Sequence, residues 1–126
     1  MPTYSFNHIA LSVKDVNESV EFYQKVLQLE EIKNTASASK TKWLSLSEGK
    51  ELHLIPRPDF EIRTNKAVHF ALSTDDIDFF AEHLRELEIE FSDWHDKPNE
   101  VFIRDDGIKQ VYFQDPNGYW IEVNNA

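Results

Sequence analysis

Residues 7–16 read NHIALSVKDV, and residues 68–77 read VHFALSTDDI. The two stretches align His8 with His69, and each alternates apolar and polar side chains before an acidic residue that suits a helix start. Alternation of this kind predicts a strand with one buried face. The chain therefore contains the same structural unit twice, and this repeat decides the fold.

The elements follow in the same order in both copies. The first copy predicts a strand over 6–13, a helix over 15–28 and strands over 31–34, 42–46 and 51–55; the second predicts a strand over 68–73, a helix over 75–87 and strands over 90–94, 110–114 and 119–124, with 101–103 as a candidate extra strand. The predicted class is α+β, with two βαβββ modules at about 5–57 and 67–124 inside one domain spanning residues 1–126.

Four predicted strands carry a ligand-type side chain on the face opposite their apolar residues. The four side chains are His8, His53, His69 and Glu122. Because successive residues of a strand point to opposite faces, the aliphatic side chains should pack on the helices and the four candidates should face the other way. Two equivalent modules related by a pseudo-twofold axis could then bring the candidates together. Three imidazoles and one carboxylate suit one divalent transition metal, such as Zn, Ni, Fe, Co or Mn.

Composition excludes several other classes of protein. The net charge of −10 disfavours nucleic acid and anionic membranes as partners. No apolar run approaches the roughly 18 residues that span a bilayer. Cysteine is absent, which excludes disulfides and thiolate ligands, and the first residues do not resemble a secretory signal. These features predict a cytoplasmic protein.

Three motifs together resemble the vicinal oxygen chelate superfamily, also called the glyoxalase/bleomycin-resistance/dioxygenase superfamily. They are HIALSVKD at 8–15 with FY at 22–23, HFAL at 69–72, and FQDPNGYWIE at 113–122. The resemblance implies an open, curved mixed barrel built from the two βαβββ modules. It also implies a homodimer, and metal ligands from the first and fourth strand of each module. Carried over by position, these ligands are His8, His53, His69 and Glu122.

The resemblance implies a metal-dependent enzyme of glyoxalase I type. Such an enzyme is a lyase or isomerase whose small α-oxygenated or thiol-adduct substrate binds through neighbouring oxygens. Glu122 is then the expected catalytic base, because it is the only carboxylate among the four candidates. Gln110 and Tyr112 share one strand face and Trp120 shares the face of Glu122, so these three side chains should line the substrate pocket.

Several alternatives stay open at this point. Similar glyoxalase I enzymes carry glutamate at the position of His53, so His53 is the least certain ligand, and Glu51 on the same face is its substitute. Tyr112 matches a substrate-contacting tyrosine of the fosfomycin transferases, which favours addition of a thiol or water to an epoxide. A third alternative is a non-enzymatic protein that binds a drug or metabolite. His83 and His95 are expected at the surface.

Overall fold

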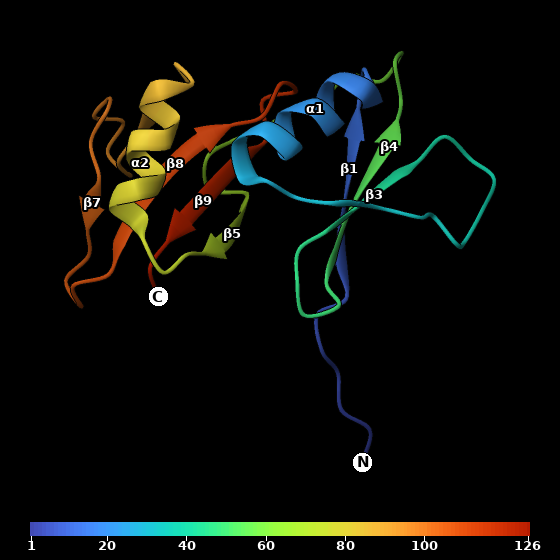
Figure 1. Ribbon diagram of the computed structural model, residues 1–126, viewed down its shortest axis with the longest axis horizontal. Coiled ribbons are helices and arrows are strands. Elements are labelled where there is room, and N and C mark those ends of the chain that lie inside the picture. Colours follow the sequence, from blue (N-terminus) through green and yellow to red (C-terminus); the bar gives the residue numbers. More distant parts are fainter. The chain divides into compact units, whose positions relative to one another are not determined.

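Each half of the chain folds into one mixed sheet with one helix against it (Figure 1). The computed structural model describes residues 1–126. Its contacts divide the chain into two units, which we call module one (Met1–Ile62) and module two (Arg63–Ala126). In both modules the first strand pairs in parallel with the last strand, and the remaining pairs are antiparallel.

The bounds of the elements repeat from one module to the other. Module one contains β1 (His8–Val13), α1 (Val16–Leu27), β2 (Glu31–Ile32), β3 (Lys42–Ser45) and β4 (Glu51–Pro56); module two contains β5 (His69–Ser73), α2 (Ile77–Glu86), β6 (Phe91–Ser92), β7 (Phe102–Ile103), β8 (Lys109–Gln114) and β9 (Trp120–Asn124). The sheet orders are β1-β4-β3-β2 and β5-β9-β8-β6, and β7 is an additional partner of β8. The helices do not cross a membrane, because neither is long and apolar enough.

Acidic residues start both helices. The Asp15 carboxylate accepts hydrogen bonds from the backbone N–H groups of Asn17 and Glu18, and that of Asp76 accepts one from Phe79. These bonds satisfy donors that the first turn of a helix leaves without partners. The equivalent aspartates therefore set the point at which each chain segment leaves its first strand.

Alternation along β4 fixes the register of module one. Leu52 and Leu54 are fully buried beneath α1, whereas His53 lies between them on the other face. Burying a leucine side chain contributes about 1.5–3 kcal/mol, so a shift of the strand by one residue would lose two such contributions and bury His53 instead. The hydrophobic pattern thus places the histidine outside the core.

In module two, β9 is buried on both faces. Ile121 and Val123 pack on the helix side, where Phe113 of β8 is also buried. On the other face, Glu122 and Asn124 are only 5% and 9% exposed. A buried carboxylate is unfavourable unless hydrogen bonds compensate it. The buried Glu122 carboxylate on this face of β9 therefore needs hydrogen-bond donors.

A tight turn delivers β9 in the correct register. The Asp115 side chain accepts hydrogen bonds from the backbone N–H groups of Asn117 and Tyr119, and Gly118 has a φ of +90°. A side chain at Gly118 would be strained at this φ and would meet Thr64 Oγ1 at 3.3 Å. The sequence Asp-Pro-Asn-Gly thus forms the predicted hairpin turn.

The predicted α+β class with two βαβββ modules is confirmed, and the short strand predicted near 101–103 is present as β7. The strand predicted from Phe6 begins at His8, because β4 begins at Glu51 and offers Phe6 no partner. Phe6 is 58% exposed. Val68 was expected to open the first strand of module two, but its N–H donates to the Asn65 carbonyl in a turn.

Two other strands are shorter than predicted, for a shared reason. The strands predicted over 31–34 and 90–94 cover only Glu31–Ile32 and Phe91–Ser92. Side chains directly after them bond back to the backbone: Asn34 Oδ1 accepts from Ala36 and Ser37, and Asp93 Oδ1 accepts from His95 and Lys97. Asparagine and aspartate favour such turns over continued strand pairing.

Candidate functional site

Strand register gives the candidate side chains equivalent positions in the two modules. His53 lies opposite Ala10 of β1 and Trp43 of β3. Glu122 lies opposite Ala71 of β5 and Tyr112 of β8. His53 and Glu122 are therefore counterparts, as the sequence repeat predicts, and Trp43 is the counterpart of Tyr112.

Module two brings His69 and Glu122 into contact. His69 Nε2 lies 3.2 Å from Glu122 Oε1. The other carboxylate oxygen, Oε2, accepts hydrogen bonds from Gln110 Nε2 at 2.8 Å and from Asn124 Nδ2 at 2.6 Å. The two amides compensate the burial of the carboxylate and fix its orientation. Oε1 is thereby left facing the imidazole.

The tautomer of His69 follows from its second contact. His69 Nδ1 lies 2.8 Å from the backbone carbonyl oxygen of Lys66. A carbonyl oxygen only accepts, so Nδ1 carries the proton and Nε2 of the neutral ring presents a lone pair. Two lone pairs, on Nε2 and on Oε1 of Glu122, then face each other at 3.2 Å. A cation between them, either a proton or a metal ion, makes this arrangement favourable.

The predicted pocket side chains surround this pair. The Tyr112 hydroxyl donates to Gln110 Oε1 at 3.2 Å, and the Tyr112 ring stands edge-on to His69 at 5.5 Å between centroids. Burial, followed by the hydrogen bond and the negative charge of Glu122, raises the pKa of Tyr112 above its usual range. Tyr112 is therefore a neutral hydrogen-bond donor beside the pair.

A cavity of about 930 Å³ opens in module two near the end of α2. Tyr112 and Trp120 both line it, with Phe91 and Phe113 among its apolar surfaces. Gln110 serves instead as the partner of Glu122. Two of the three predicted substrate-binding side chains thus line this cavity, which neither His69 nor Glu122 does, and the third orients the carboxylate.

Module one holds its candidate side chains in a stack of rings. His53 lies between His8, at 4.1 Å, and Trp43, at 4.2 Å between ring centroids. His53 Nε2 donates to Glu51 Oε1 at 2.9 Å, because a carboxylate only accepts. His8 Nδ1 lies 2.7 Å from Asn7 Oδ1. The nitrogens left for a metal are then Nδ1 of His53 and Nε2 of His8.

No group of three or more histidine, aspartate or glutamate side chains is arranged so that it could hold a metal ion. The candidates occur as two pairs, one in each module. His95 lies exposed in the loop after β6, as expected. His83 differs from expectation, because α2 leaves it only partly exposed, with its ring 6.2 Å from that of Phe80.

Sequence inspection missed three side chains of this region. Asn124 lies two residues from Glu122 on the same strand face, so alternation could have found it. Trp94 was assigned to a strand, but it lies in a loop with its ring 5.4 Å from that of Tyr112. Lys66 was assigned to a polar linker, and its side chain carries no sequence signal, since only folding brings it to Ser92 and Asp93.

Comparison with known proteins agrees with the α+β fold of the chain. The family that matches residues 5–123 is described as the Glyoxalase/Bleomycin resistance protein/Dioxygenase superfamily. The chain belongs to this superfamily.

Three relatives illustrate its breadth. The chain is 28% identical to Glyoxylase I 4 of Arabidopsis thaliana, over 97% of this chain and 71% of that protein. It is 29% identical to the metallothiol transferase FosB of Staphylococcus epidermidis, over 100% and 84% of the two chains. Among solved structures, the fosfomycin resistance protein FosX of Listeria monocytogenes superposes with a TM-score of 0.76 at 25% identity, over 99% and 95% of the two chains.

Proposed function

We propose that the protein is a metal-dependent enzyme of glyoxalase I type. It would act as a lyase or isomerase on a small α-oxygenated substrate or its thiol adduct. The observation that carries the proposal is the pair of lone pairs on His69 Nε2 and Glu122 Oε1, 3.2 Å apart. Neighbouring ligands at about 2.1 Å from one ion stand roughly 3 Å apart, so this distance fits a shared metal.

The ligands of one divalent transition metal would be His8, His53, His69 and Glu122, as one pair from each module. The proposal holds whether the two pairs belong to one chain or to two copies of it. The metal would supply Lewis-acid stabilisation of charge on the substrate oxygens. Zn, Ni, Fe, Co and Mn all suit this set of donors.

Glu122 is the proposed catalytic base. Its Oε2 is held by Gln110 and Asn124, so Oε1, once it loosens from the metal, would take a proton from the carbon next to the substrate carbonyl. Return of that proton to the neighbouring carbon would complete an isomerisation. His53 occupies the counterpart position and is no carboxylate, so one base would have to serve both steps on one face of the substrate.

Tyr112 and Trp120 would bind the substrate. Both line the cavity of module two. The raised pKa of Tyr112 keeps its hydroxyl protonated, and the hydroxyl would turn from Gln110 Oε1 to donate to a substrate oxygen. Gln110 would act on the substrate indirectly, through the orientation of Glu122.

Metal analysis of the purified protein and a turnover screen test this proposal. We expect about one divalent metal per pair of modules, and turnover of hemithioacetals that disappears on chelation and returns with added metal. A protein that binds no divalent metal, or that turns over hemithioacetals equally well in chelator, would contradict it.

Addition of a thiol to an epoxide is the second candidate. Its support is Tyr112, whose protonated hydroxyl lies at the carboxylate end of the site where an epoxide oxygen would need a donor. The likeness to a metallothiol transferase is consistent with it. The same screen, with epoxides and low-molecular-weight thiols, separates the two reactions. Binding of a drug or metabolite without turnover would instead favour a non-enzymatic protein.

We also propose a homodimer. The resemblance to two-module relatives supports it, since such chains commonly pair. Light scattering after size exclusion should give twice 14.8 kDa, and a monomer would contradict the proposal.

A further inference from the structure

Lys66 has the most fully bonded ammonium group among the charged side chains of module two. Its Nζ lies 3.0 Å from Ser92 Oγ, 2.7 Å from the Asp93 carbonyl, 3.3 Å from the Trp94 carbonyl and 2.8 Å from Asp96 Oδ1. An ammonium has three donors, and here four acceptors share them. The side chain is only 13% exposed. Lys66 therefore has no N–H left to bind an anionic substrate.

Three aromatic rings complete the surroundings of this ammonium. Nζ lies 5.1 Å from the ring centroid of Trp120, 5.2 Å from that of Tyr112 and 5.7 Å from that of Trp94. A cation within about 6 Å of a ring centroid is attracted to the face of the ring. We refer to these three rings and the four oxygen acceptors as the ammonium cage. Its occupant is the protein's own lysine.

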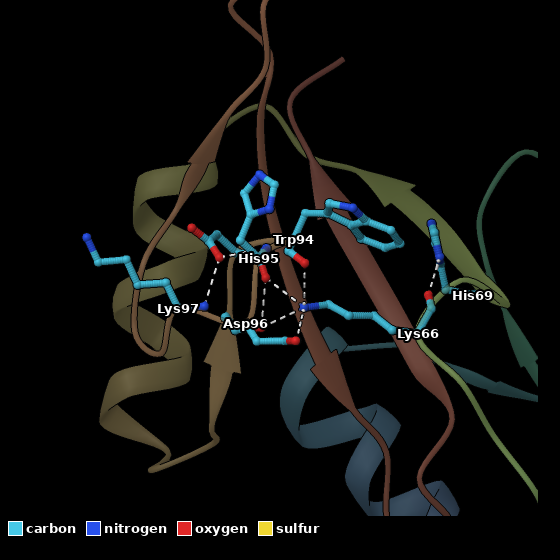
Figure 2. A network of polar contacts seen from close by, with 8 residues as sticks. Lys66, His69, Trp94, His95, Asp96 and Lys97 are labelled. Atoms are coloured by element: carbon cyan, nitrogen blue, oxygen red, sulfur yellow. Dashed lines mark hydrogen bonds and ion pairs between the residues drawn. The ribbon is translucent and has the colours of Figure 1, made fainter.

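The backbone of the same residue contacts the His69–Glu122 pair. The Lys66 carbonyl accepts the Nδ1 proton of His69, while its side chain extends to the loop that carries Trp94 and Asp96 (Figure 2). Trp94 in turn lies 6.3 Å from His69 between ring centroids. One residue therefore connects the loop after β6 with the imidazole that faces Glu122.

We propose that Lys66 is a positioning residue: by filling the ammonium cage, it holds the loop over residues 92–97 and the wall formed by Trp94, Tyr112 and Trp120 in place beside His69. Its effect on metal binding rests on the proposed function. Its effect on the loop does not, because the cage contacts exist without a metal.

Removal and chemical replacement of the lysine side chain test this role. Lys66→Ala removes three methylenes and the ammonium, which is the structure of 1-propylammonium. Amide hydrogen exchange over residues 93–97 should become at least roughly tenfold faster in the variant, because its loop opens locally. Added 1-propylammonium should restore slow exchange, whereas 1-propanol, of similar volume and without charge, should not.

Binding of Co²⁺, followed by its visible spectrum, reports on the His69–Glu122 pair. Lys66→Ala should bind Co²⁺ about tenfold more weakly than the natural chain and with an altered visible spectrum, since the group that orients His69 has moved. 1-Propylammonium should recover both properties. Lys97→Ala is the matched control, because Lys97 belongs to the same loop but its ammonium only reaches Glu100, at 4.0 Å. It should leave exchange and cobalt binding unchanged.

Unchanged exchange in Lys66→Ala, or equal recovery with propanol, would overturn the proposal. If that variant does not fold, Lys66→Met carries the test. Methionine keeps an apolar side chain of similar length in this 13% exposed position and removes the ammonium, so the fold should be preserved while exchange over 93–97 still becomes faster; no change would again contradict the role of Lys66. If the natural chain fails to bind Co²⁺, the proposed function fails, while the exchange and recovery results still decide whether Lys66 fills the cage.

Discussion

The counterpart positions His53 and Glu122 are held in different ways. Glu122 is 5% exposed and is fixed by two amide donors and an imidazole. His53 has one hydrogen bond, to Glu51, and is otherwise fixed by stacking between His8 and Trp43. The duplicated backbone gives both residues the same place in their sheets, and the neighbouring side chains differ. Repetition of a module thus fixes position, whereas the neighbours determine how strongly a side chain is bound.

This difference predicts that both modules are needed for the metal, but that the ligand of module two also supports the fold. We expect Glu122→Ala and His8→Ala each to abolish binding of divalent metal in titration calorimetry. Glu122→Ala should also lower the free energy of unfolding by about 1–3 kcal/mol, because Gln110 and Asn124 lose their shared acceptor.

His95→Ala is the control for these variants, since His95 is exposed and belongs to neither pair. Full metal content in both Glu122→Ala and His8→Ala would show that the two pairs do not form a metal site.

A smaller effect is expected at the counterpart position. His53→Gln should still bind metal, but with an affinity lower on the order of tenfold to a hundredfold. The reason is that an amide oxygen is a poorer ligand than imidazole for Zn, Ni or Co. His53→Glu should make the two modules more alike and raise isomerase activity on hemithioacetals. Unchanged affinity in His53→Gln would remove His53 from the ligand set and leave the other three side chains.

Replacement of Glu51, the hydrogen-bond partner of His53, should change metal affinity less than replacement of His53 does. Glu51→Gln leaves a carboxamide oxygen to accept the Nε2 proton, so the ring orientation should persist while its basicity falls. We expect about tenfold weaker metal binding by titration. Stronger binding in Glu51→Gln would mean that Glu51 competes with the metal for His53, which would reverse the role assigned to it.

The smallest effect concerns pH and the phenol of Tyr112, whose counterpart in module one is Trp43. The folded pKa of Tyr112 is raised, whereas in the unfolded chain the phenol titrates near about 10. Below that pH both states are protonated and Tyr112 adds no pH dependence. Above it only the unfolded state ionises, so stability should fall as pH rises.

Urea unfolding of the natural chain and of Tyr112→Phe at a series of pH values measures how Tyr112 contributes to the pH dependence of stability. The difference in unfolding free energy should be constant at neutral pH and should shrink above pH about 10. A constant difference throughout would mean that folding leaves the ionisation of Tyr112 unchanged.

The sequence alone determined the duplication and the faces of the strands. Alternation around His53 and Glu122 fixes which side of each sheet they occupy, because a shift by one residue would expose the core leucines, isoleucine and valine. The helix start at Asp15 was equally readable, since a cap needs only local residues, whereas the predicted start at Asp75 lies one residue before the observed cap, Asp76. Candidate ligands could thus be named from short-range patterns.

Only the tertiary structure decided how these side chains are held. The Gln110 amide on Glu122 and the proton of His69 on the Lys66 carbonyl depend on strand pairing and on the path of a loop. The ammonium cage joins Lys66 to residues far along the chain, and no periodicity encodes such contacts. The physical reason is range: strand faces follow from neighbours in sequence, whereas tautomers, carboxylate orientation and cation contacts follow from neighbours in space.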